Sequence, residues 1–176
     1  MSSGTTDLNT LIAELEEENR ELRFTSFGYD DAWNLGNDLV ALSQAAKHPA
    51  AVAIFFGEQR VFHAALAGSA VNNDVWLERK VRTVRRFNES SYLVGRRFAL
   101  SGQNFDKDAK VDPLLYAACG GAFPLRVGDV MVGVVAFSGL PHEVDHAVIV
   151  AAIRRAMERQ SVGTAASAPS SEAPSS

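Results

Sequence analysis

The sequence has a single cysteine, Cys119, among 176 residues. One cysteine can neither form an intrachain disulfide nor supply the several thiolates of a structural zinc site, so both kinds of scaffold are excluded. No sequence context near Cys119 indicates a lowered thiol pKa, and we therefore expect a buried structural thiol. This cysteine usage is typical of a reducing cytoplasm.

Long apolar runs are also absent, because no stretch approaches the about 20 residues that a membrane-spanning helix needs. The residues that follow Met1, SSGTT, are polar, whereas a secretory signal has basic and then apolar residues at this place. We therefore expect a cytoplasmic protein with no membrane span.

Positive charge is scarce as well. The formal net charge is −4 and the pI is about 5.6, whereas nucleic-acid binding needs a basic surface that displaces phosphate counterions. The glycine pair Gly120-Gly121 lacks the further glycine and the lysine of a phosphate-binding loop. These absences argue against nucleic acid as a partner and against a dinucleotide or P-loop site.

The sequence does have enough apolar residues for one core, since they make up 47% of the chain. We expect a flexible N-terminus over 1–7 and a single domain over 8–160. Residues 161–176 are rich in Ser, Ala and Pro. Such a composition buries too little apolar surface to offset the entropy of ordering, so we expect a disordered tail there.

Five runs have the composition and spacing of β-strands, at 22–27, 51–56, 60–66, 123–127 and 130–138. Short turns at 57–59 and at Gly128-Asp129 join two pairs of these runs, and each pair is expected to be an antiparallel hairpin. Helical patterns surround the strands and begin near Leu8, Asp30, Asn72, Ser90, Asp112 and Pro141, with a bend expected at Gly95. The pattern predicts an α+β fold with a five-stranded, mainly antiparallel sheet flanked by helices.

Five segments occur in a characteristic order: HAAL at 63–66, NNDVWLERK at 72–80, SSYLVGRR at 90–97, GGAFPLRV at 120–127 and VAFSGLPHEVDH at 135–146. In these segments the chain resembles a branch of the haem-degrading-domain superfamily, which includes GlcG-like and HbpS-like proteins and the C-terminal domain of some cobalamin adenosyltransferases. The resemblance covers residues 8–158. It implies a profilin-like α+β domain that assembles into homo-oligomers, and haem or a related tetrapyrrole as the ligand of some members.

The same resemblance implies a ligand pocket formed by the glycine segment and by the Ser-Gly turn before the last helix. The residues expected to line this pocket are Gly120, Gly121, Pro124, Ser138, Gly139 and His142. A backbone N–H at a glycine turn can fix the orientation of a ligand in such a pocket.

His63 is the candidate metal ligand. It lies on the second strand of the first predicted hairpin, where alternate side chains reach a sheet face, and a neutral imidazole can ligate haem iron or zinc. The alternative is a hydrogen-bonded structural histidine, which is the commoner role of a lone histidine on a strand.

Two predicted helices supply further candidates. Trp76 and Tyr92 could form an aromatic wall for a flat ligand, with core packing as the alternative for Trp76. Arg79 could bind the carboxylate or phosphate of an anionic ligand through its bidentate fork. The alternative is a subunit interface or a solvated basic face, to which these side chains belong: Arg79, Lys80, Arg82, Arg85 and Arg86.

The segment from His142 to His146 reads HEVDH and matches the HExxH pattern of zinc proteases. Pro141 puts the segment at a helix start instead of a helix interior, and no third ligand follows at a suitable spacing. We therefore interpret the match as coincidental. Glu143 and Asp145 would instead complement the positive end of the helix dipole.

Three functional hypotheses follow. The first is a cytoplasmic, homo-oligomeric protein that binds a small anionic ligand or a tetrapyrrole, with haem implied by the resemblance alone. The second is an enzyme that degrades haem oxidatively, with His63 or His142 on the iron. The third is a non-catalytic assembly or adaptor protein, in which the acidic first helix and the basic helix over 79–86 dock partners. The sequence assigns no catalytic residue.

Overall fold

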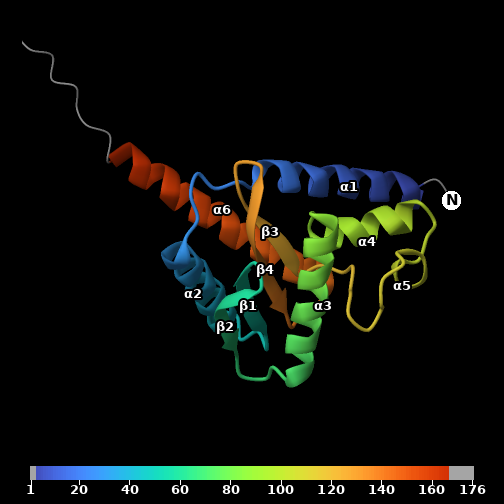
Figure 1. Ribbon diagram of the computed structural model, residues 1–176, viewed down its shortest axis with the longest axis horizontal. Helices are drawn as coiled ribbons and strands as arrows, with labels where there is room; N and C mark the ends of the chain where they lie inside the picture. The colour runs from blue at the N-terminus through green and yellow to red at the C-terminus, as the bar shows by residue number, and fades with distance from the viewer. Residues whose placement is uncertain (1–2, 167–176) are drawn as a thin grey trace, which may run out of the picture.

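The computed structural model describes residues 3–166, and the surroundings of side chains over 7–163. The helices are α1 (Ser3–Glu21), α2 (Tyr29–Ala45), α3 (Val71–Phe87), α4 (Ser91–Leu100), α5 (Phe105–Asp108) and α6 (His142–Ala166) (Figure 1). The strands are β1 (Ala51–Phe56), β2 (Gln59–Ala65), β3 (Ala122–Val127) and β4 (Val130–Ser138). No helix within 3–166 combines the length and the apolar character that crossing a membrane requires.

The four strands form one antiparallel sheet in the order β2-β1-β4-β3. Both hairpins predicted from their turns are confirmed, because β1 pairs with β2 and β3 pairs with β4. The hairpins join in the middle of the sheet, where Ile54 of β1 lies opposite Val135 of β4. The α+β class is therefore confirmed.

The fifth strand, predicted over 22–27, is wrong. Phe24 makes a single parallel bridge to Val127, with its N–H donating to the Arg126 carbonyl at 2.8 Å. The alternation that suggested a strand comes from two buried side chains, Leu22 and Phe24, that anchor a connection between α1 and α2. Because α2 begins only a few residues later, the segment is too short to continue along the edge of β3.

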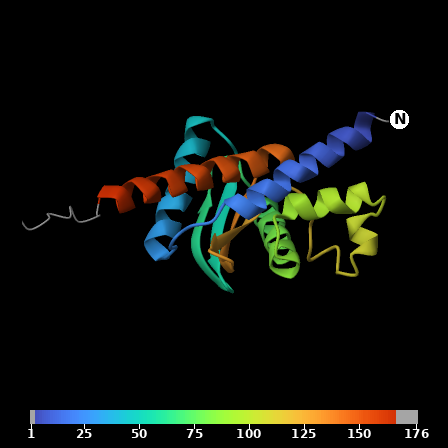
Figure 2. The same ribbon diagram turned by 90° about the horizontal axis from the view of Figure 1, so that it is seen from above.

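The two faces of the sheet carry side chains of different size. On one face, Val52 and Ile54 belong to a large cluster with the buried side chains of α2 and α6. On the other face, Ala51 and Ala53 belong to a smaller cluster with Leu77 and the other buried residues of α3. Figures 1 and 2 show α2 and α3 on opposite sides of the sheet. The small alanine side chains leave the room that α3 occupies.

The first helix lies beside the sheet and runs along α4 (Figures 1 and 2). Its apolar side chains face α4, since Leu15 is buried in one cluster with Tyr92 of α4. The side chain of Asn19 holds the start of α4: its Oδ1 accepts from the Ser90 N–H at 2.7 Å and its Nδ2 donates to Ser90 Oγ at 3.0 Å. Residues on α1 therefore fix the position of α4.

The helix predicted to begin at Asp112 is also wrong. The Asp112 carbonyl accepts from the N–H groups of Leu115 and Tyr116, and its Oδ1 accepts from the Leu114 N–H at 2.8 Å. The aspartate therefore closes a turn through its own side chain, which competes with helix propagation. The short helix of this region is α5, which starts earlier, at Phe105.

Helical backbone extends into both segments that were expected to lack order, since α1 begins at Ser3 and α6 continues to Ala166. The flexible N-terminus and the disordered tail were also expected to include residues 1–2 and 167–176, which lie outside the described residues.

Gly95 shows why a glycine is tolerated inside α4. The helix is continuous over Ser91–Leu100, and a Cβ atom on Gly95 would lie 2.0 Å from the carbonyl oxygen of Ala118. The close approach of the 117–119 segment, and not a break in the helix, explains the missing side chain.

Replacing Gly95 by alanine is expected to lower the free energy of unfolding by about 1–3 kcal/mol, the usual cost of overpacking. The matched control is Gly163→Ala, also in a helix, where the added Cβ would meet nothing within 4 Å. The control is expected to lose no stability and to gain up to about 1 kcal/mol from helix propensity. Urea unfolding measures both variants, and equal free energies would contradict the packing argument.

Candidate functional site

A buried ion pair joins α3 to α6. Lys80 is 2% exposed, and its Nζ donates to the carbonyls of Gly120 (3.1 Å) and Phe137 (2.6 Å) and to Oδ2 of Asp145 (3.2 Å). The three ammonium hydrogens thus each have an acceptor. The prediction that Lys80 belongs to an exposed basic face is wrong.

Asp145 completes the ion pair from the first turn of α6. Its Oδ1 accepts from the Leu140 N–H at 2.9 Å. Burial raises the pKa of Asp145 above its ordinary value, and the positive charge of Lys80 and the Leu140 N–H oppose that rise. A buried carboxylate with these partners fixes the turn after β4 onto α6.

The glycine pair lets the loop before β3 lie against this ion pair. A Cβ on Gly121 would lie 2.3 Å from Lys80 Nζ, and its φ of +116° is a conformation that side chains disfavour. A Cβ on Gly120 would lie 1.8 Å from the carbonyl oxygen of His142. Close packing between backbone segments therefore accounts for both glycines.

A cleft of about 400 Å³ opens above the ion pair between α3 and α6, and we call it the α3–α6 cleft. Its lining consists of Asn72, Asn73, Trp76, Lys80, Cys119, Gly120, Ser138, Gly139, Leu140, His142 and Asp145. Besides the bonds of Lys80, a hydrogen bond from Asn73 Nδ2 to the Ser138 carbonyl at 3.2 Å joins the two walls.

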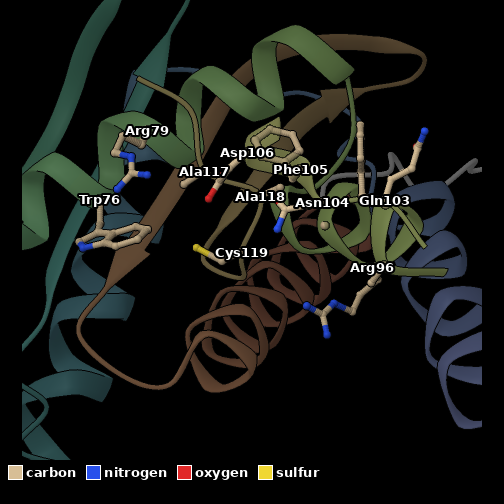
Figure 3. A pocket seen from close by; sticks show the side chains of 13 residues that line it. Trp76, Arg79, Arg96, Gln103, Asn104, Phe105, Asp106, Ala117, Ala118 and Cys119 are labelled. Carbon is tan, nitrogen blue, oxygen red and sulfur yellow. The ribbon is translucent and has the colours of Figure 1, made fainter. Parts of the chain in front are cut away.

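A second space of about 330 Å³ lies between α3 and α4, and we call it the α3–α4 hollow. It shares Trp76 and Cys119 with the cleft, so the two spaces adjoin at these residues. Figure 3 looks into the hollow, with Arg79 beside Trp76, and Cys119 between that pair and Arg96. The guanidinium of Arg79 lies over the Trp76 ring, 4.2 Å from its centroid.

His142 offers a hydrogen-bond donor at the edge of the α3–α6 cleft. Its Nδ1 accepts from the Gly120 N–H at 3.4 Å, so the proton of the neutral ring belongs on Nε2. That Nε2 lies 2.9 Å from Oε1 of Glu143, which is exposed. The ring packs edge-on against Tyr92 at a centroid distance of 5.3 Å.

The two histidines of the HEVDH segment have separate partners. His146 is buried, and its Nε2 lies 2.8 Å from Oε2 of Glu18 on α1, whereas His142 is engaged with Gly120 and Glu143. Among the side chains that the structure describes, no group of three or more His, Cys, Asp or Glu is arranged to hold a metal ion.

The predicted site residues are partly brought together. The α3–α6 cleft contains Trp76, Gly120, Ser138, Gly139 and His142.

The other predicted residues lie elsewhere. Arg79 lines the α3–α4 hollow, and its Nη2 donates to the Pro113 carbonyl at 2.8 Å. Tyr92 packs against His142 without lining the cleft. Gly121 lies beneath Lys80, and Pro124 is buried in the edge strand β3.

His63 also lies outside the lining of the cleft. It faces the start of α3, with Nε2 at 2.6 Å from Oδ1 of Asp74, and both side chains are 32% exposed. In this geometry His63 is a hydrogen-bonded histidine that connects β2 to α3, which was the alternative to a metal-ligating role.

Sequence reasoning missed Lys80 and Asp145 as residues of the cleft. A signal existed for Lys80, because it lies three residues after Leu77 and four before Val84, both of which are buried. No local signal could have identified Asp145 as its partner, since the two are separated by 65 positions.

Residues 27–154 match a family model described as "Haem degrading protein HbpS-like". The chain belongs to the HbpS-like family. The matched stretch contains all four strands, and α1 precedes it. The resemblance predicted from the five sequence segments is therefore confirmed.

Known HbpS-like relatives carry the designation UPF0303 protein. The one from Streptomyces avermitilis is 50% identical over 149 residues, which are 84% of this chain and 91% of the relative. The one from Streptomyces coelicolor is 48% identical over 145 residues, covering 82% of this chain and 92% of the relative. The one from Psychromonas ingrahamii is 33% identical over 143 residues, which are 81% of this chain and 90% of the relative.

Solved structures share the HbpS-like fold. The crystal structure of the Ybr137w protein has a TM-score of 0.77 and 26% identity, covering 87% of this chain and 89% of that one. The crystal structure of HbpS has a TM-score of 0.60 at 16% identity, and the match covers 76% of this chain and 92% of that one. The PduOC:heme complex has a TM-score of 0.63 at 15% identity, and the match covers 73% of this chain and 94% of that one. The last two likenesses show the fold alone.

Replacing Lys80 by methionine is expected to lower the free energy of unfolding by about 3–5 kcal/mol, because Asp145 is then buried without its partner. The double variant Lys80→Met/Asp145→Asn removes the unpaired charge and is expected to recover part of that loss. Urea unfolding measures both. A double variant no more stable than the single one would contradict this assignment.

The stability of the single variant Lys80→Met is also expected to depend on pH, in a direction that the pKa of Asp145 determines. The pKa of Asp145 is raised above 3.8, its ordinary value, so the folded protein binds this proton more tightly than the unfolded chain. The contribution of Asp145 to the stability of Lys80→Met therefore falls as the pH rises above about 4, so the loss of stability relative to wild type grows with pH. Unfolding curves of both proteins at several pH values test the sign, and a loss that shrinks as the pH rises would contradict it.

Proposed function

We propose that this protein binds a small flat ligand in the α3–α6 cleft, and that the ligand is haem or a related tetrapyrrole. The position of Trp76 carries the proposal, because this residue borders both the cleft and the α3–α4 hollow. Cofactor pockets are commonly of about 300–1,000 Å³, and an aromatic ring offers a stacking surface to a flat molecule. Two adjoining spaces with one aromatic wall suit an extended, planar ligand.

Polar groups around the cleft suit the rim of such a ligand. His142 presents its Nε2 to Glu143, a side chain that is 56% exposed and therefore accessible to a competing acceptor. Asn72 is exposed at the start of α3 and offers an amide at the opposite wall. These donors match carboxylates or other acceptors on the edge of a ligand.

The residues of the cleft do not fit ligation of a haem iron. A ligating imidazole nitrogen must be unprotonated and accessible, but both ring nitrogens of His142 are engaged, Nδ1 with the Gly120 N–H and Nε2 with Glu143. Burial raises the pKa of the Cys119 thiol, which disfavours the thiolate that would bind iron. His63 lies outside the lining and is engaged with Asp74. A tetrapyrrole would thus be held through its ring and its periphery.

Family membership supports the tetrapyrrole part of the proposal. The family description names haem degradation, and the fold is that of a domain solved in a heme complex. Oxidative degradation of haem would need an axial ligand for the iron. The cleft presents none, so binding is the function we propose for it.

Titration with hemin and with iron-free protoporphyrin IX tests the proposal, with absorption and tryptophan fluorescence as readouts. Both compounds are expected to bind saturably and with similar affinity, because the iron needs no protein ligand. Trp76→Leu is expected to weaken both by about 2- to 12-fold through the loss of aromatic stacking. The control His63→Ala is expected to leave both affinities unchanged, because His63 lies outside the cleft.

Saturable binding of hemin alone, abolished by His63→Ala, would show iron ligation and overturn binding through the periphery. The absence of saturable binding for both compounds would overturn the ligand proposal and favour the assembly or adaptor hypothesis. The homo-oligomer and the cytoplasmic location stay predictions, and light scattering of the purified protein measures the first of them.

A further inference from the structure

No described residue accepts a hydrogen bond from the Arg96 guanidinium, whereas Arg79, whose Nε is likewise buried without a partner, donates through Nη2 to the Pro113 carbonyl. The Nε of Arg96 is buried without a hydrogen-bond partner, and no described carboxylate lies within ion-pair distance of its guanidinium. The next residue, Arg97, by contrast pairs with both Glu16 and Glu89. The two Nη groups of Arg96 are not buried and also have no acceptor among the described residues, so they are the donors that an external acceptor can reach.

The surroundings of Arg96 place its charge next to the cleft donor. Its Cζ lies 5.4 Å from the centroid of the Tyr92 ring, and the same ring lies 5.3 Å from the ring of His142. Arg96 also lines the α3–α4 hollow, where it lies across Cys119 from Trp76 in Figure 3. Arg96 and His142 therefore flank one aromatic ring between α4 and α6.

Two acidic side chains lie in this neighbourhood: Asp106, which lines the α3–α4 hollow together with Arg96, and Glu143. Burial raises the pKa of Tyr92, and the charges of Arg96 and Glu143 act on that pKa in opposite directions, so both side chains lie near the phenol. Glu143 accepts from His142 and makes no ion pair with Arg96. An incoming anion would compete with the Glu143 carboxylate for the His142 Nε2–H.

We propose that Arg96 is the anchor for a carboxylate group of the ligand, with the Nε2–H of His142 as a second donor. This inference rests on the proposed function of the α3–α6 cleft. It extends that proposal from a flat ligand to one that carries at least one carboxylate at its edge. Sequence analysis had placed the anionic contact on Arg79, whose guanidinium is instead held by Trp76 and by the Pro113 carbonyl.

The chemistry of the guanidinium favours a carboxylate. A carboxylate presents two oxygens in a plane, which match two parallel N–H donors of an arginine fork, and the two Nη groups of Arg96 supply such a pair. Its single negative charge equals the single positive charge of Arg96, while His142 contributes a neutral donor. The propionate groups of a tetrapyrrole have this chemistry.

Hemin and hemin dimethyl ester provide a matched pair of probes, because they share the ring and the iron and differ only in whether the carboxylates are free. Arg96→Gln is expected to weaken hemin binding about tenfold and to leave binding of the ester unchanged. Glu143→Gln is expected to tighten hemin binding, because it removes the competing carboxylate. The control Arg97→Gln makes the same charge change outside the hollow and is expected to alter neither affinity.

The outcomes separate the anchor from the site itself. If wild-type protein binds hemin and its ester equally and Arg96→Gln changes neither affinity, the anchor is overturned and the proposed function stands. If Arg96→Gln weakens both probes equally, Arg96 has a structural role and the anchor is again overturned. If wild-type protein binds neither probe, the proposed function fails and the anchor fails with it.

Discussion

The ammonium group of Lys80 is the contact on which the rest of the structure depends. It holds the carbonyls of Gly120 and Phe137 and the carboxylate of Asp145, and so joins α3, the loop before β3, the end of β4 and the first turn of α6. These four parts also form the walls of the α3–α6 cleft. A charge buried at 2% exposure is sustained only because every hydrogen has an acceptor.

The empty space of the cleft follows from the same packing. At Gly120 and Gly121 a Cβ atom would lie within 2.5 Å of a neighbouring atom, so no side chain fits at these two positions. Trp76 and His142 are then the large side chains left at its sides. The cleft therefore has the ion pair and the glycine loop at its floor and an aromatic ring and an imidazole at its sides.

Much of the fold could be predicted because its signals are local. The turns at 57–59 and at Gly128-Asp129 identified both hairpins, and the helical spacing identified α2, α3, α4 and α6. The predictions failed where a long-range contact or a side-chain bond decides the outcome. Phe24 alternates like a strand residue but anchors a connection, and Asp112 closes a turn. For the candidate site, sequence identified Trp76 and His142 but not the ion pair beneath them or the unpaired Arg96, since partners distant in sequence determine both.

The first helix precedes the stretch that matches the family model, yet it reaches the back of the candidate site. Its Leu15 packs in one cluster with Tyr92, and its Glu18 holds His146, whose ring also contacts Tyr92. Tyr92 thus has α1 behind it and His142 and Arg96 in front. A ligand that moves the Tyr92 ring would therefore disturb a contact of α1, and amide exchange along α1 would report that movement from outside the cleft.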